Sequence, residues 1–252
     1  MISICYNYST NDFCFLNKLL EESNKITDDI HITYVDKFLD GSPENSDLLN
    51  ETYNLTRGKA KLAEINYDNN LQYSIGLNNV FRYYHNFTRL INFRKTKYDY
   101  VLFLDSDEII DSDRFIKWLN SINLNDYNCY VLSCFWYFRN IKYQSKTHEN
   151  AGWLVNKKRI DENIIMDYRE RSAMEINPLA YSVKSLDDIP MIHHYSWAKG
   201  NSDEECKNLL LRKVSSWGHS GDRNWKALIE EEFNRPFMGI DFVHGYEYNI
   251  LE

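Results

Sequence analysis

The hydrophobic pattern of the first half of the chain predicts strands and helices in alternation. Short apolar runs have the length of buried strands, and the segments between them carry apolar residues at the spacing of one helix face. Alternation of this kind indicates a mostly parallel sheet covered by helices on both faces, so we expect an α/β/α sandwich. A polar loop is expected after the second strand. Strands are expected at Ile2–Tyr6, His31–Asp36, Lys61–Ile65 and Tyr100–Leu104, and helices from Asn11 or Asp12 to Ser23 and from Leu71 to Phe93 with a break near Gly76.

The second half is harder to assign, because charged residues interrupt its pattern between positions 156 and 188. Helices are favoured where capping residues precede an apolar stripe. No repeat and no linker divides the chain, so we expect one domain over residues 1–252. The expected helices begin at Asp111 or Ser112, at Ser202 and at Asn224, and the expected strands are Tyr130–Phe138, Trp153–Val155 and, as a strand or an ordered loop, Pro190–Trp197.

The amino-acid composition limits the kinds of molecule that the protein can bind and the cellular compartment in which it is expected. Hydrophobic residues make up 43% of the chain, enough for a sizeable core, and 19 Tyr supply flat faces with a polar edge that suit sugars and bases. A net charge of −8 argues against nucleic-acid binding, which needs a basic surface. The five Cys show no paired spacing, and no signal peptide or membrane span is evident. We therefore expect a cytoplasmic protein without an integral membrane segment.

Two copies of the tripeptide Asp-Ser-Asp occur, and their contexts separate them. The pattern alone is expected by chance in so acidic a chain. The copy at 111–113 has no strand before it and is best interpreted as a helix N-terminus, where acids favour the positive end of the dipole. The copy at 105–107 directly follows the apolar run Tyr100–Leu104. Its acids therefore emerge together at the carboxyl end of a buried strand.

The carboxyl end of a strand is where open α/β sheets bind ligands. The carboxylates of Asp105 and Asp107 would repel each other unless a cation lay between them. Hard oxygen ligands suit Mg²⁺ or Mn²⁺. An acidic protein that binds a diphosphate also needs local positive charge, which such a cation supplies.

The segment YVLFLDSDEII, residues 100–110, resembles the DxD strand of family 2 and related GT-A glycosyltransferases. The resemblance covers about residues 1–120. It implies a GT-A-like fold and a metal-dependent enzyme that moves a sugar from a nucleotide-diphosphate donor, with a UDP-sugar favoured, to a glycan or other hydroxyl acceptor with inversion. Residues 1–120 would then bind the donor. Residues 121–252 would form the acceptor half and a C-terminal helical lid.

The resemblance also assigns residues to the donor. Arg89 lies sixteen residues before Asp105, as in these enzymes, although Leu90 stands where they usually have Asn. Tyr6 and Asp36 match positions that hold the nucleotide, and Ser106 lies between the two acids. The acidic Gly-Ser turn of the family appears loosely at 40–42.

A downstream His often completes the metal site in such enzymes, and a basic residue after it meets the diphosphate. His193 and His194 are followed by Lys199, so both types are present. Neighbouring residues of a strand point to opposite faces, so only one His can face the metal. We favour His194, which would share a face with Ile192, and His193 stays the alternative. Lys213 and His219 are further candidates for phosphate or acceptor contacts.

An inverting transferase needs a carboxylate that takes a proton from the acceptor hydroxyl. No spacing singles one out. Asp167 is our choice because it follows the apolar residues 164–166, and Asp222 is a second candidate. The other acids of this region are Glu149, Asp161, Glu162, Glu170 and Glu175.

Two rival enzyme classes share the acid pair, and a third interpretation does not require it. A haloacid-dehalogenase-like phosphatase would place the strand near its start and follow it with Thr or Val, where this chain has Ile109. A primase-like polymerase conflicts with the charge of −8. A non-catalytic nucleotide- or glycan-binding module would not need metal ligands.

Overall fold

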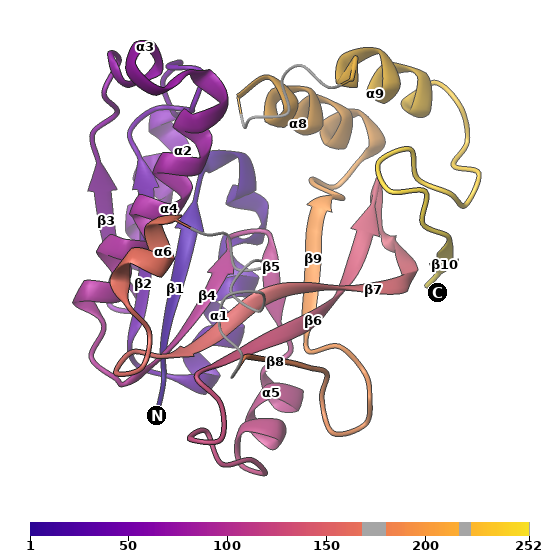
Figure 1. The fold of residues 1–252 in the computed structure, drawn as a ribbon. Coiled ribbons are helices and arrows are strands. Elements are labelled where there is room, and N and C mark those ends of the chain that lie inside the picture. The colour runs from indigo at the N-terminus through magenta and orange to yellow at the C-terminus, as the bar shows by residue number, and fades with distance from the viewer. Residues whose placement is uncertain (168–179, 217–222, 252) are drawn as a thin grey trace.

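The computed structural model describes residues 1–167, 180–216 and 223–251. Within these ranges one curled sheet has the strand order β3-β2-β1-β4-β7-β6-β9-β5, with β10 beside β7 and β8 beside β6 (Figure 1). The strands are β1 (Ser3–Tyr8), β2 (Ile30–Val35), β3 (Lys61–Ile65), β4 (Tyr100–Asp105), β5 (Glu108–Ile110), β6 (Cys129–Phe138), β7 (Asn140–Asn156), β8 (Ala180–Val183), β9 (Ile192–Trp197) and β10 (Tyr248–Ile250). The helices are η1 (Thr10–Phe15), α1 (Leu16–Ile26), α2 (Ser46–Thr56), α3 (Leu71–Ile75), α4 (Leu77–Lys95), α5 (Ser112–Leu119), α6 (Glu162–Asp167), α8 (Asp203–Ser216) and α9 (Trp225–Phe233).

The first half of the fold is a parallel α/β layer, as the alternating pattern predicts. Strands β3, β2, β1 and β4 run parallel. Alternate residues of β1 face opposite layers. Ile4 and Tyr6 pack with α1, whereas Cys5 packs with Leu90 and Phe93 of α4. The expected α/β class with helices on both faces of the sheet is confirmed.

The expectation of a mostly parallel sheet holds only for that first half. Strand β7 runs antiparallel to both β4 and β6. The single residue Arg139 separates β6 from β7, and so tight a connection can join only antiparallel strands. Strand β9 is parallel to β6, so the second half of the sheet is mixed.

Several elements differ from the sequence-based expectation, which also did not include the strands β8 and β10. The segment after β2 is not all loop, because α2 begins there with Asn45, whose side chain accepts hydrogen bonds from the first helical N–H groups. Helix α2 buries Thr52 and Thr56, and Leu49 and Leu55 pack against the core while partly exposed, so its apolar stripe is narrow. Strand β7 is much longer than Trp153–Val155, and β5 was not expected.

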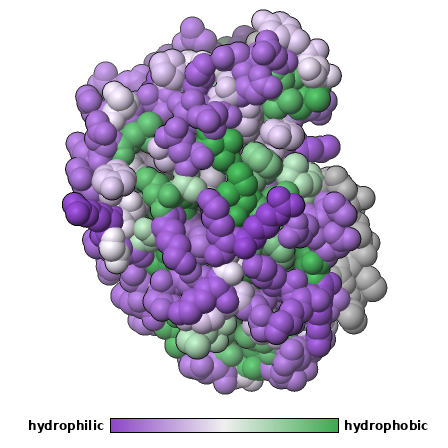
Figure 2. All heavy atoms as spheres, turned by 90° about the vertical axis from the view of Figure 1, so that its left-hand side faces the viewer, coloured by the Kyte–Doolittle hydropathy of each residue, from purple (hydrophilic) through white to green (hydrophobic). Residues whose placement is uncertain are grey.

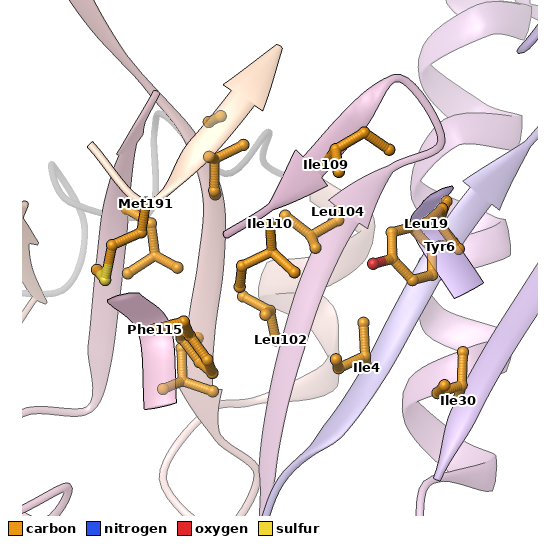
Figure 3. Packing of buried hydrophobic residues seen from close by; sticks show 14 of the residues in the cluster. Ile4, Tyr6, Leu19, Ile30, Leu102, Leu104, Ile109, Ile110, Phe115 and Met191 are labelled. Carbon is orange, nitrogen blue, oxygen red and sulfur yellow. The ribbon is translucent and has the colours of Figure 1, made fainter. Parts of the chain in front are cut away.

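Strand β4 is central because its two faces belong to two apolar layers. Leu102 and Leu104 lie with Ile109 and Ile110 of β5 (Figure 3), and the opposite face packs on α4. Strand β7 approaches β4 closely at Gly152. A Cβ there would lie 2.4 Å from Leu104 and 2.8 Å from a backbone oxygen, so only glycine fits.

Arg139 joins the β6–β7 turn to the C-terminal helices. It has a left-handed backbone (φ 61°), and its side chain is buried. The guanidinium donates to Asp203 of α8 and, at 3.1 and 2.7 Å, to the carbonyls of Glu232 and Arg235. It therefore fixes α8 and α9 over the ends of β6 and β9 (Figure 1). Their role as a lid remains a prediction.

Glu22 of α1 is expected to make stability depend on pH. Its carboxylate accepts hydrogen bonds from Ser112 and lies 2.8 Å from Lys18. Burial raises the pKa of Glu22, but the hydrogen bonds from these partners have the larger effect and lower it from an ordinary 4.5 to about 2. A depressed carboxyl pKa stabilises the fold above the unfolded pKa, and this contribution is lost as the pH falls through the folded pKa.

We therefore expect Glu22→Gln to lower the free energy of unfolding by about 2 kcal/mol at pH 7, and by progressively less between pH 4.5 and pH 2. Urea unfolding at several pH values measures this. Glu21→Gln is the matched control, because Glu21 is exposed and contacts Lys18 and Lys25, the two lysines that also contact Glu22. A deficit that stays constant with pH would contradict the assignment.

The surface at the β3 edge is mainly hydrophilic, with separate apolar patches between the polar residues (Figure 2). In the part of the chain that is described, no helix has both the length and the apolar character needed to cross a membrane.

Candidate active site

The two acids of the Asp-Ser-Asp segment lie where β1 and β4 end side by side. Asn7 of β1 pairs with Asp105 of β4, and its carbonyl accepts from the Ser106 N–H at 3.0 Å. The chain then turns into β5, and the carbonyl of Asp107 accepts from the Tyr195 N–H of β9 at 2.8 Å. The turn is therefore anchored on both sides. It gives the two carboxylates separate surroundings.

Asp105 faces α4. Its Oδ1 accepts from Arg89 at 2.8 Å, and His85 Nε2 lies 3.2 and 3.3 Å from its two oxygens. The amide of Asn7 donates to it at 3.3 Å. Burial raises the pKa of Asp105, but the charges of His85 and Arg89 outweigh burial and hold it well below the ordinary range. Asp105 is therefore a fixed anion that positions Arg89.

Asp107 faces β9 and α8. Lys199 Nζ lies 3.2 Å and Lys213 Nζ 3.6 Å from its Oδ2, and His194 Nε2 lies 3.5 Å from its Oδ1. The antiparallel pairing of Glu108 with His194 brings this histidine to the acid. Burial raises the pKa of Asp107, but the two lysines lower it well below the ordinary value.

Lys199 is a buried bridge between two acids. It donates to Asp12 of η1 as well as to Asp107, and its side chain is 2% exposed. Ser106 donates to the other oxygen of Asp12 at 2.8 Å. Burial opposes the charge of Lys199, but Asp12 and Asp107 outweigh it and raise the pKa of the ammonium group. Lys199 therefore stays charged and ties η1 to the turn.

A divalent cation fits this site with few protein ligands. Asp107 Oδ1 and His194 Nε2 are 3.5 Å apart, a separation that one ion about 2.1 Å from each atom can bridge. The Asp105 carboxylate is held instead by Arg89 and His85. Among the described residues, no group of three or more His, Cys, Asp or Glu is arranged to hold a metal. The three-ligand set of Asp105, Asp107 and His194 stays a prediction.

The remaining sequence-based candidates lie in different places. Tyr6 is fully buried in the core, and its hydroxyl bonds to Ser23, so it contacts no ligand in this arrangement. Asp36 follows β2 and accepts from the Tyr67 N–H at 2.6 Å. His193 bonds to Tyr137, away from the acids.

The candidate bases lie in the second half of the chain. Asp167 ends α6, which packs against α4, but its side chain lies outside the described residues. Asp222 and His219 also lie outside them, as do Glu170 and Glu175.

Three residues of the site were missed at the level of sequence. The sequence distances from Asn7 and His85 to the acid pair match no known motif. Only folding brings these two residues to Asp105. Asp12 was expected to cap a helix, whereas Ser9 caps η1 and Asp12 faces Lys199. A polar residue directly after an apolar first strand was the only available signal for Asn7.

No family model matches the chain, and no curated protein matches it in sequence. Solved structures similar to it include the galactosyltransferase LgtC in complex with donor and acceptor sugar analogs, at 12% identity and a TM-score of 0.46, covering 92% of this chain and 96% of that one. Staphylococcus aureus TarS in complex with UDP has 12% identity and a TM-score of 0.46, with 92% and 70% covered. The inositol-1-phosphate CTP transferase of T. maritima has 8% identity and a TM-score of 0.49, with 82% and 95% covered. These are likenesses of general fold, and the chemistry has to be argued from the site.

Proposed function

We propose that this protein is a glycosyltransferase that moves a sugar from a nucleotide-diphosphate donor, with a UDP-sugar favoured, to a hydroxyl of a glycan or other acceptor, with inversion. The observation that carries the proposal is the acid pair at the carboxyl end of β4, set among fixed cations. Ligands of parallel α/β sheets bind at this edge. Preorganised charges at such an edge can stabilise a leaving diphosphate.

The charge balance of the site favours a metal–diphosphate pair over a lone anion. Three basic side chains face four carboxylates, so the site has no surplus positive charge for a lone anion. A divalent cation and a diphosphate that enter together leave this balance almost unchanged. The basic side chains are Arg89, Lys199 and Lys213, and the carboxylates are Asp12, Asp105, Asp107 and Glu108, whose Oε1 lies 3.8 Å from His194 Nε2.

In this proposal Asp107 and His194 would hold Mn²⁺ or Mg²⁺, with phosphate and water completing the shell. The ion would offset charge that develops on the leaving diphosphate. Lys213 reaches the site from α8 and is 13% exposed, so it can meet a phosphate oxygen more readily than buried Lys199. Asp36 is the candidate for a nucleotide contact. An acid between residues 149 and 222 would take the acceptor proton, with Asp167 and Asp222 as the sequence-based candidates.

Metal dependence is tested by measuring nucleotide binding, without an activity assay. We expect calorimetry to give at least a tenfold tighter Kd for UDP with Mn²⁺ than with EDTA, equivalent to about 1.4 kcal/mol. His194→Ala should remove most of this difference, whereas His31→Ala, at a buried histidine that pairs with Asp29 and not with Asp107, should not. Equal affinities with and without Mn²⁺ would refute the metal claim.

The reaction is tested by release of nucleoside diphosphate from a panel of nucleotide sugars with Mn²⁺. We expect slow hydrolysis of one donor even without acceptor, because water can replace the hydroxyl. If the folded protein turns over none of them, the non-catalytic binding-module alternative is favoured instead.

A further inference from the structure

A group of aromatic and acidic side chains lies next to His194, beyond the residues assigned above. The ring of Trp136 packs edge-on against His194, with centroids 4.7 Å apart, and His244 packs edge-on against Trp136 at 4.8 Å. Tyr246 stacks on His244 at 5.1 Å and donates a 2.5 Å hydrogen bond to Glu149. The group therefore extends from the predicted metal ligand to a carboxylate.

Strand register places this group on one face of the sheet. Trp136 of β6 pairs with His194 of β9, and Cys134 of β6 pairs with Glu149 of β7. Residues two apart in a strand share a face, so Glu149, Trp136 and His194 point to the same side. That side is also the side of Asp107, which His194 contacts.

The loop that supplies His244 and Tyr246 is held rigidly by one buried acid. The carboxylate of Asp241 accepts hydrogen bonds from four successive backbone N–H groups, those of residues 243 to 246, at 2.6 to 3.2 Å. It also accepts from the Tyr248 hydroxyl at 2.8 Å. A loop that is already ordered loses little conformational entropy when a ligand binds to its rings.

Two polar atoms of the group lack partners within the described part of the chain. They are Trp136 Nε1, on a residue that is 4% exposed, and His194 Nδ1. Buried polar atoms of proteins are almost always hydrogen-bonded to protein or to ordered water, so a polar ligand or a water is expected to bond to these two atoms. Access is available beside them, because the side chains of Glu149 and His244 are 11% and 30% exposed.

We propose that this group is the acceptor subsite and that Glu149 is the catalytic base; this rests on the proposed function. A sugar offers apolar C–H faces for the rings of His244 and Tyr246, and hydroxyls for the unpartnered nitrogens. In the transfer, the acceptor O–H proton passes to the Glu149 carboxylate. The oxygen electron pair forms the bond to the anomeric carbon. The bond from that carbon to the diphosphate oxygen breaks, and its electron pair leaves with the nucleoside diphosphate.

The test compares three variants in turnover and in binding. Glu149→Gln keeps the shape and loses the proton acceptor, so turnover should fall roughly 10²- to 10⁴-fold with water or with methyl glycosides as acceptors. The Kd for UDP with Mn²⁺ should stay within about twofold. Tyr246→Phe removes one hydroxyl and should slow turnover roughly tenfold. The control is Glu247→Gln in the same loop, because the Glu247 carboxylate is exposed and pairs with Lys146.

The outcomes separate this proposal from the one on which it rests. A wild-type protein that turns over no nucleotide sugar refutes the proposed function itself. If the wild type is active and folded Glu149→Gln keeps its turnover, the base assignment is overturned. It is also overturned if Glu149→Gln loses UDP affinity in step with activity, because the carboxylate would then belong to donor binding.

Discussion

Replacing Asp107 by Asn is expected to lower donor turnover by at least about 1,000-fold, which corresponds to about 4 kcal/mol in the activation barrier. The carboxylate gathers Lys199, Lys213 and His194 around one point. An amide keeps the size of the side chain but not its charge. The two ammonium groups would then lose the counter-charge that lies between them, and the proposed metal position would lose a carboxylate ligand.

The chain contains a matched control for this experiment. Asp113→Asn changes the last residue of the second Asp-Ser-Asp copy, which lies exposed in the first turn of α5. We expect this variant to retain wild-type turnover of the same nucleotide sugar. Comparable activity of Asp107→Asn and Asp113→Asn would show that the first copy has no special role.

Replacing Lys199 by Met is expected to lower the free energy of unfolding by about 3–5 kcal/mol. Lys199 is buried between Asp12 and Asp107, and Met has a similar length without the charge. Its removal leaves two buried carboxylates close to each other, with Lys213 as the nearest remaining ammonium for Asp107. Removal of one partner of a buried ion pair destabilises the fold by more than the pair itself stabilises it, because the remaining charge stays buried without a partner.

Chemical unfolding of Lys199→Met and of Lys226→Met measures this effect. Lys226 is an exposed residue of α9, so its substitution should change stability by less than about 0.5 kcal/mol. If both variants unfold at the same denaturant concentration, the buried bridge does not exist in solution.

The strand that carries the site could be predicted from the sequence because one local pattern determines it. The apolar run before Asp105 identifies a buried strand, and a buried strand of an α/β sheet delivers its last residues to the ligand-binding edge. Lys199 and His194 were found through the resemblance, and they do lie beside Asp107. No local pattern connects Asn7 or His85 to Asp105, since those contacts exist only after β1 and α4 pack on β4.

Helices and strands could be predicted where the local conformational preference and the pattern of buried residues indicate the same element. Strand β3 and the break at Gly76, which has φ 80°, were found with the correct residues. Helix α2 was missed because its apolar stripe is narrow. Its two fully buried residues are threonines, and Leu49 and Leu55 stay partly exposed. The mixed second half was missed because antiparallel pairing of β7 depends on a one-residue turn at Arg139, whose backbone conformation is unusual for any residue except glycine.

The Lys199 bridge has a consequence for how the chain is made. Lys199 is separated from Asp107 by 92 residues and from Asp12 by 187. At a synthesis rate of about 5–20 residues per second, Lys199 leaves the ribosome roughly 5 to 20 s after Asp107. During this interval the parallel half of the sheet can already pair, but its turn carries unbalanced negative charge. Closure of the site is therefore a late step of biogenesis, because the ammonium groups of Lys199 and Lys213 both come from the C-terminal part of the chain.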